Sequence, residues 1–405
     1  MELTVKEKQK AVAIMAPRYQ KARKKQKGAI LNEFIELTGY GRRYASYVLR
    51  NHGKKVRINA TTVVQGDVRK SFTRKKPKVY DTAVEDALKK IWYIMDCICG
   101  KRLAPILKEI VLRLERFREI KLTEVVRQKL FTISSASIDR LLAKERKRYQ
   151  IKGRCNTKPG TLLKNQIPIR TFSDWNENKP GFVEVDLVGH DGGDGSGDFA
   201  QTLDVTDVCT TWTETQAVKN KAQIWVFDAL MDIRQRMPFS LLGIDSDSGG
   251  EFINAHLFEY CQKEKITFTR SRSGRKNDSC FVEQKNYSII RRTVGYLRHD
   301  TEEELLTLNE LYRYLRLYTN FFQPTMKLIE KTRIGSKVTK KYDKALTPYR
   351  RVLACLDVSA QDKKKLRAQY SKLNPAHLKR EIKKLQQKLL RLATTKKSKK
   401  RKTAA

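Results

Sequence analysis

The sequence has no apolar run long enough to cross a membrane, and its N-terminus, MELTVKEKQK, has no apolar signal core. A membrane-spanning helix needs about 20 consecutive apolar residues, so neither a membrane partner nor export is expected. The 7 cysteines are scattered, odd in number and without a CxxC pair. This pattern favours reduced thiols over a disulfide framework or a zinc site. We therefore expect a cytoplasmic protein.

Acidic residues are scarce as well. The chain has 44 Asp and Glu against 85 Lys and Arg, which gives a formal net charge of +41. The hydrophobic share of 40% is ordinary for a globular protein, so the excess charge belongs to its surface. A basic excess of this size favours a nucleic acid as partner.

The acids that are present gather in the middle of the chain. Residues 1–180 carry 43 basic and 17 acidic side chains, and residues 301–405 carry 28 and 9. Residues 181–300 carry 14 basic and 18 acidic side chains. Basic flanks around an acidic middle indicate ends that hold a polyanion and a centre suited to metal ions.

Residues 28–52 have the pattern of two short helices around the glycine turn GYG. The second helix is expected to face inward with Tyr44, Val48 and Leu49. It also carries Arg42, Arg43 and Arg50, which could contact phosphates or the major groove. The prediction is a helix-turn-helix DNA-binding domain at 1–60 and a basic linker at 61–81. An ordinary helical hairpin with solvated arginines is the alternative.

A second helical region, 82–148, also has the pattern of two helices joined by a short turn. The segment 122–148, LTEVVRQKLFTISSASIDRLLAKERKR, predicts one helix to Leu130, a turn with Ser134 or Ser135 as N-cap, and a second helix with a basic end. We expect a second, helix-turn-helix-like DNA-binding domain here. Residues 149–178 have little periodicity and are interpreted as a strap between domains.

From residue 181 the apolar pattern changes from a period of 3.6 to a period of 2. The segments GFVEVDLV, FAQTLDVTD and TWTETQAV predict a three-stranded antiparallel meander. A helix, a strand, a helix, a short strand and a long helix at 279–298 follow. This order is that of a ribonuclease H-like core. We therefore expect an α/β core at 179–325, with a mixed five-stranded sheet flanked by helices.

Three acids lie where such a core would bring them together. Asp186 lies in the first strand, Asp247 ends the fourth, and Glu283 is near the start of the long helix. Convergent carboxylates repel one another, and divalent cations relieve that repulsion. Spacing alone does not choose between Glu184 and Asp186, or between Asp245 and Asp247, because the members of each pair share a strand face. For the second pair, the turn SGG directly after Asp247 favours Asp247 as the exposed ligand.

The long helix and the loop before it carry candidate DNA contacts. At 100° per residue, Tyr287, Arg291 and Arg298 form a stripe beside Glu283, whereas Lys285 and Arg292 point away. A solvated flank is the alternative for this stripe. The loop residues expected at the mouth of the site are Arg270, Arg272, Arg275 and Lys276.

The loop GHDGGDGSGD at 189–198 joins the first two strands. Its acids Asp191, Asp194 and Asp198 could bind a cation, but its glycines favour a mobile hairpin loop. His190 is interpreted as a loop residue and not as a ligand.

The segments VDLV, DSGGEF and KNDSCFVEQKN, with 35 residues between Asp247 and Glu283, resemble the three motif blocks of the DDE transposases of bacterial insertion sequences, which have a retroviral-integrase-like catalytic core. The resemblance covers residues 181–324. It implies that Asp186, Asp247 and Glu283 bind Mg²⁺ or Mn²⁺, as two ions. It also implies cleavage of DNA at the element's ends and strand transfer into target DNA. The histidine and cysteine zinc module of retroviral integrases is absent.

The partners that follow from this resemblance are double-stranded DNA, as terminal inverted repeats and target, and further copies of the chain in a homodimer or higher oligomer. A small-molecule substrate is not expected, and the cytoplasmic protein would associate with the nucleoid. Two alternatives remain: a catalytically silent DNA-binding repressor, and a metal-dependent ribonuclease H-like nuclease.

The basic C-terminal region, 326–405, contains a heptad seam in the predicted helix 375–393. Its apolar positions are Leu378, Ile382, Leu385, Leu389 and Leu392. A seam of about two heptads fits a short coiled coil or a helix docked on its own protein equally well. The tail KKSKKRK is expected to be a disordered arm that contacts DNA.

Overall fold

The computed structural model describes residues 3–57, 59, 61, 63–65, 79–148, 179–247, 251–252, 254–271 and 280–403. The chain divides into two units, Met1–Val79 and Tyr80–Ala405, which are considered separately. The predicted strap at 149–178 and most of the basic linker lie outside the described residues.

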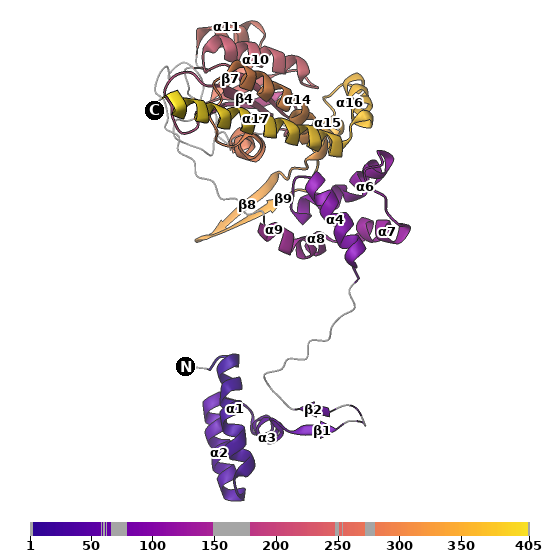
Figure 1. Cartoon of the computed structure of the whole chain (residues 1–405), viewed down its shortest axis with the longest axis vertical. Helices are drawn as coiled ribbons and strands as arrows, with labels where there is room; N and C mark the ends of the chain where they lie inside the picture. The colour runs from indigo at the N-terminus through magenta and orange to yellow at the C-terminus, as the bar shows by residue number, and fades with distance from the viewer. Residues whose placement is uncertain are drawn as a thin grey trace. The chain divides into compact units, whose positions relative to one another are not determined.

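The first unit has three helices and a small hairpin (Figure 1): α1 (Val5–Lys21), α2 (Lys24–Thr38), α3 (Arg42–Asn51), β1 (Lys55–Arg57) and β2 (Val63–Gln65). Gly39 ends α2 with φ of 69°, a left-handed conformation that glycine adopts without strain. The two helices predicted around this turn are therefore present. The hairpin was not predicted.

One inward position of α3 was predicted wrongly. Val48 and Leu49 are buried, but Tyr44 is 52% exposed and its ring packs edge-on against Tyr40. Ala45 takes the buried position instead, because α3 begins at Arg42 and places residues 45, 48 and 49 on one face.

The second unit begins with a helical block: α4 (Thr82–Ile94), α5 (Gly100–Leu103), a 3₁₀ turn (Ala104–Ile106), α6 (Leu107–Arg116), α7 (Glu124–Thr132), α8 (Ser135–Leu141) and α9 (Ala143–Arg148). The Ser134 hydroxyl accepts a hydrogen bond from the Ser137 amide at 3.2 Å, so the predicted N-cap is confirmed. The buried side chains of this block form one apolar core with those of the C-terminal helices.

A five-stranded sheet is the centre of the second unit. Its strands are β3 (Phe182–Gly189), β4 (Gln201–Asp207), β5 (Thr213–Val218), β6 (Gly243–Ser246) and β7 (Thr267–Arg270), in the spatial order β5-β4-β3-β6-β7. β3, β4 and β5 are antiparallel neighbours, whereas β6 and β7 run parallel to β3. The predicted mixed sheet and its antiparallel meander are confirmed.

Helices cover both faces of this sheet. α10 (Gln223–Arg236) and α11 (Ala255–Lys263) pack on one face. α12 (Cys280–Lys285) and α14 (Glu302–Phe322) pack on the other, joined by a π-helical turn (Asn286–Arg291) and α13 (Arg292–Val294). The predicted order of strands and helices is thus confirmed.

The C-terminal region adds a hairpin of β8 (Leu328–Ile334) and β9 (Lys337–Tyr342), then α15 (Pro348–Ala354), α16 (Ala360–Lys372) and α17 (Pro375–Thr403). α17 lies along α14 (Figure 1) and buries Leu378, Ile382, Leu385 and Leu389. The seam therefore docks on its own chain. α17 continues past residue 393, where the pattern predicts its end, through most of the tail, as the helix propensity of lysine allows. No helix in the described ranges has both the length and the apolar composition needed to span a bilayer.

Candidate active site

The two faces of the sheet have opposite chemistry because side chains alternate along each strand. Val183 and Val185 of β3 point toward α10 and α11 and belong to the apolar core there. Glu184 and Asp186 point to the other face, and the strand register places Thr206 and Asp204 of β4 beside them. We call this second side, which α12 and α14 cover, the polar face. It is the location of the predicted carboxylates.

Asp186 is half-buried in β3 and held in a fixed orientation. Its Oδ1 accepts a hydrogen bond from the Leu187 amide at 2.8 Å, and its Oδ2 accepts one from Asn286 Nδ2 at 2.6 Å. Burial raises the pKa of Asp186 to about 7, and the negative charges of Asp247 and Glu283 act in the same direction. The three acids therefore lie within electrostatic range of one another. Asn286, three residues after Glu283, was not recognised from the sequence, although the i, i+3 spacing on a helix would have put it beside Glu283.

The structure distinguishes Asp247 from Asp245. Asp245 pairs with Glu184 in the register of β3 and β6, is 1% exposed, and its Oδ1 accepts a hydrogen bond from Thr269 Oγ1 at 2.5 Å. Asp247 follows the end of β6, is more exposed, and is the acid whose charge acts on Asp186. Asp247 therefore remains the better candidate for a ligand.

Glu184 fixes the start of the helix that carries Glu283. Its Oε2 accepts a hydrogen bond from the Val282 amide at 2.8 Å, at the N-terminal turn of α12. Oε1 has no hydrogen-bond partner among the described residues. Burial, with the charges of Asp245 and Glu283, raises the pKa of Glu184 well above its ordinary value. Because Val282 directly precedes Glu283, this hydrogen bond holds the exposed Glu283 close to β3.

Lys285 does not point away from the core as the helical wheel predicted. It is 5% exposed and lies on the buried side of α12 with Val282. Burial lowers the pKa of Lys285 to about 8, although the negative charge of Asp204 on β4 opposes the shift. The helical wheel places this lysine in solvent because a charged residue on an amphipathic helix ordinarily lies on the water side.

Two of the three members of the predicted stripe on the long helix, Arg291 and Arg298, bind carbonyls of their own chain. The helix ends at Val294, and Gly295 then adopts φ of 80°. Arg298 is therefore not on the helix, and its guanidinium donates to the carbonyls of Asp194 at 2.7 Å and Ser196 at 2.8 Å. Arg291 lies in the π-helical turn and donates to the Gly189 carbonyl at 2.8 Å. The π turn changes the angle per residue at Arg291, and the end of the helix at Val294 takes Arg298 off the wheel altogether.

The remaining candidate DNA contacts have different surroundings. Tyr287 is 55% exposed, and Arg42, Arg43 and Arg50 of α3 are exposed. Arg270 is not a loop residue, because it ends β7 and is 6% exposed. Arg272, Arg275 and Lys276 lie outside the described residues.

The acidic glycine loop is hydrogen-bonded to Arg298. Arg298 binds several of its carbonyls, and Asp191 forms a bridge with Arg298. The carboxylate of Asp191 accepts the Gly193 amide at 3.1 Å. His190 at the loop's start is buried, with Nε2 2.7 Å from the Thr202 hydroxyl.

The donor set of Asp186, Asp247 and Glu283 suits a divalent metal. Carboxylate oxygens are preferred ligands of Mg²⁺ and Mn²⁺, and the pKa of Asp186 is raised mainly by burial and in addition by the charges of Asp247 and Glu283. Nowhere in the described ranges do three or more His, Cys, Asp or Glu side chains already lie close enough to hold an ion.

Comparison with solved structures gives partial likenesses. The chain is similar to the HTLV-2 integrase catalytic core domain in complex with magnesium, at 14% identity and TM-score 0.28, over 36% of this chain and 90% of that one. It is also similar to the catalytic core domain of BIV integrase, at 15% identity and TM-score 0.28, over 42% and 91%. Likenesses at these scores carry no inference about function. No family model matches the chain.

One relative is much more similar in sequence. An uncharacterized protein of Sinorhizobium fredii, y4rM, is 38% identical over 340 residues, which are 84% of this chain and 93% of that protein. The chain belongs to the same family as y4rM.

Proposed function

We propose that the protein is a metal-dependent polynucleotidyl transferase that acts on DNA. Within this class we propose a DDE transposase, which cuts the ends of its element and joins them to target DNA. The observation that carries the proposal is that Asp186 of β3 lies where the charges of both Asp247, after the end of β6, and Glu283 of α12 act on it. The motif resemblance and the net charge of +41 support DNA as the substrate.

In this mechanism Asp186, Asp247 and Glu283 would hold Mg²⁺ or Mn²⁺. Two such ions activate an attacking oxygen and stabilise a leaving oxygen in phosphoryl transfer. Asn286 orients the Asp186 carboxylate through its hydrogen bond to Oδ2. Glu184 keeps the start of α12, and so Glu283, against β3.

DNA would reach this site through exposed basic and aromatic side chains. The exposed Tyr287 lies one turn after Glu283 and could pack against a DNA strand. Arg42, Arg43 and Arg50 of the first unit would bind the terminal repeats, and Arg272, Arg275 and Lys276 would bind near the metals. Two element ends require at least two active sites, so we expect a homodimer or higher oligomer on DNA.

The test is strand transfer by the full chain with duplexes that carry the inverted repeats flanking its coding region, in Mg²⁺. We expect Asp247→Asn and Asp186→Asn to lower the rate by about a thousandfold, since a metal supplies several kcal/mol of transition-state stabilisation. Asp245→Asn is the matched control and should remain active. Strand transfer by Asp247→Asn would overturn the assignment, and loss only in Asp245→Asn would move the ligand by two residues.

Metal binding can be measured without catalysis. Mg²⁺ or Mn²⁺ at about 100 times its dissociation constant should stabilise the wild type by about 2.7 kcal/mol in thermal unfolding. Asp247→Asn should lose most of this gain and Asp245→Asn should keep it. Specific binding to the repeats without strand transfer or metal stabilisation would favour the silent repressor instead.

A further inference from the structure

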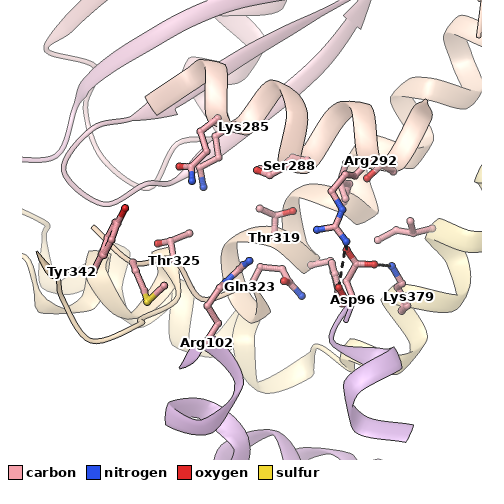
Figure 2. A pocket seen from close by; sticks show the side chains of 17 residues that line it. Asp96, Arg102, Lys285, Ser288, Arg292, Thr319, Gln323, Thr325, Tyr342 and Lys379 are labelled. Atoms are coloured by element: carbon pink, nitrogen blue, oxygen red, sulfur yellow. Dashed lines mark hydrogen bonds and ion pairs between the residues drawn. The ribbon is translucent and has the colours of Figure 1, made fainter. Parts of the chain in front are cut away.

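A cavity of about 280 Å³ lies in the second unit, and none of the three proposed metal ligands lines it. Figure 2 shows its walls, which come from α12 and the π-helical turn, α14, α17, and the segment around Asp96 and Arg102 of the helical block. This volume suits a phosphate with ordered water or part of one nucleotide, and is too small for a duplex.

Among the charged side chains of the lining, the basic ones outnumber the acidic ones. Four cations face a single acid: Arg102, Lys285, Arg292 and Lys379 against Asp96. Asp96 Oδ1 binds Lys379 Nζ at 2.5 Å, and its Oδ2 binds Arg292 Nη2 at 3.1 Å. The one acid in the lining is therefore already shared by two of the cations.

The other two cations, Arg102 and Lys285, form no ion pair within 4.0 Å in the described part of the chain, although the negative charge of Asp204 acts on Lys285 from outside the lining. Arg102 Nε donates to the Pro324 carbonyl at 2.5 Å, which fixes the guanidinium and leaves its two terminal nitrogens for another partner. Lys285 is 5% exposed, and no hydrogen bond of its ammonium occurs among the described residues. In Figure 2 Arg102 and Lys285 extend from opposite walls toward the same space.

Such an arrangement is costly unless an anion binds to it. Burying a charge without a partner costs several kcal/mol, and the charges of Arg102 and Arg292 repel each other. Ser288 and Thr319 add hydroxyl groups to the lining. Several donors around one small space match the oxygens of a tetrahedral phosphate, and arginine forms paired hydrogen bonds with that group.

We infer that this cavity is a phosphate-binding site in which Arg102 and Lys285 contact the phosphate from opposite walls. The phosphate site rests on the cavity alone. That the phosphate belongs to a nucleotide of the DNA strand rests on the function proposed above, since Lys285 is two residues from Glu283. A free phosphate or mononucleotide is the other source of the same chemistry.

Calorimetric titration of the metal-free full chain with inorganic phosphate and with deoxyadenosine monophosphate tests the site. We expect Arg102→Gln and Lys285→Met each to weaken phosphate binding at least tenfold. The matched control is Lys263→Met, which removes an exposed charge of α11 and should bind as the wild type does. Because the chain is so basic, only this difference between variants, and not binding itself, supports the proposal.

Equal phosphate affinity of the wild type and Lys285→Met would overturn the site. Failure to fold is not expected for Lys285→Met, because it removes a buried charge and keeps the length of the side chain, and thermal unfolding checks this. Glu283→Gln should abolish strand transfer but keep phosphate binding. If the wild type binds phosphate through Arg102 and Lys285 but transfers no strand, the site stands and the proposed function fails.

A duplex with one uncharged methylphosphonate linkage, moved along the transferred strand, identifies the source. If the phosphate belongs to DNA, one linkage should weaken binding by the wild type and have no further effect in Lys285→Met, because the two changes remove the same contact. Phosphate binding with no sensitive linkage supports the site and assigns it to free phosphate or a mononucleotide.

Discussion

The apolar and the polar face of the five-stranded sheet are both covered by helices, yet they are built from different side chains. Toward α10 and α11 the sheet presents valine, leucine, isoleucine and phenylalanine in one apolar core. Toward α12 and α14 it presents Glu184, Asp204 and Asp245, all buried, with threonines between them.

This difference separates what stabilises the fold from what the proposed function requires. Apolar burial contributes about 25 cal/mol per Å², whereas a buried carboxylate costs stability unless it is fully paired. Glu184 and Asp204 each have one carboxylate oxygen with no hydrogen-bond partner in the described part of the chain. We interpret the polar face as a region where buried carboxyl groups lower the stability of the fold and serve the proposed function. Truncation of a buried side chain on the apolar face should therefore lower stability, whereas removal of a buried acid on the polar face should raise it.

The largest effect on stability is expected on the apolar face. Ile233 of α10 is fully buried in the apolar core, so Ile233→Ala should lower the free energy of unfolding by about 2–5 kcal/mol through lost burial and a new cavity. Denaturant unfolding measures this. Ile224→Ala on the same helix is the control, because Ile224 is 62% exposed and its loss should change stability by no more than about 0.5 kcal/mol. Equal effects of the two substitutions would contradict the comparison.

On the polar face, removal of a charge should raise stability. Glu184→Gln keeps an acceptor for the Val282 amide and removes a buried carboxyl group whose ionised form burial and Asp245 disfavour. We expect a gain of roughly 1 kcal/mol in thermal unfolding. Strand transfer should fall at the same time, because the start of α12, and with it Glu283, is held less firmly.

Val185→Ala is the matched substitution for this test, since Val185 is the next residue of β3 and points to the apolar face. It should lower stability by roughly 2 kcal/mol and leave strand transfer unchanged in the folded protein. A loss of stability in Glu184→Gln as large as in Val185→Ala would show that the two faces stabilise the fold in the same way.

The sequence predicted the sheet well because its alternation is strong and its turns are marked by glycine. It also predicted that Asp186 of the first strand and Asp247 at the end of the fourth would come together, and in the structure these two strands, β3 and β6, are neighbours. It did not reveal that the polar face is buried. Alternation with polar side chains ordinarily indicates a face in contact with water, and only the packing of α12 and α14 covers Glu184 and Asp204.

The errors on the long helix have a local cause. A wheel assumes one angle per residue, and the π-helical turn Asn286–Arg291 departs from it. The π turn accounts for Arg291, and the helix end at Val294 accounts for Arg298; both arginines bind carbonyls of their own chain. Lys285 precedes the π turn, and it was misplaced because a buried lysine is rare and no local pattern signals one.

The smallest predicted effect concerns the pH dependence of stability at the edge of the polar face. His190 is buried against the His299 ring at 5.6 Å, and burial, with the charges of His299 and Arg291, lowers the pKa of His190 well below its ordinary value of 6.5. The facing groups are Thr202, which lies 2.7 Å from Nε2 and bonds Tyr312, and Glu304, which lies 3.2 Å from His299 Nδ1.

Because His190 stays neutral in the folded chain and is protonated in the unfolded chain below about pH 6.5, its contribution to stability is lost as the pH falls through that value. Urea unfolding at pH 7, 6 and 5 should therefore show a smaller loss of stability for His190→Gln, which keeps an amide near Thr202, than for the wild type. Parallel pH profiles of the two proteins would mean that His190 accepts a proton while folded. The polar face would then tolerate an added positive charge at its edge, and the contrast with the apolar face would be limited to the buried carboxylates.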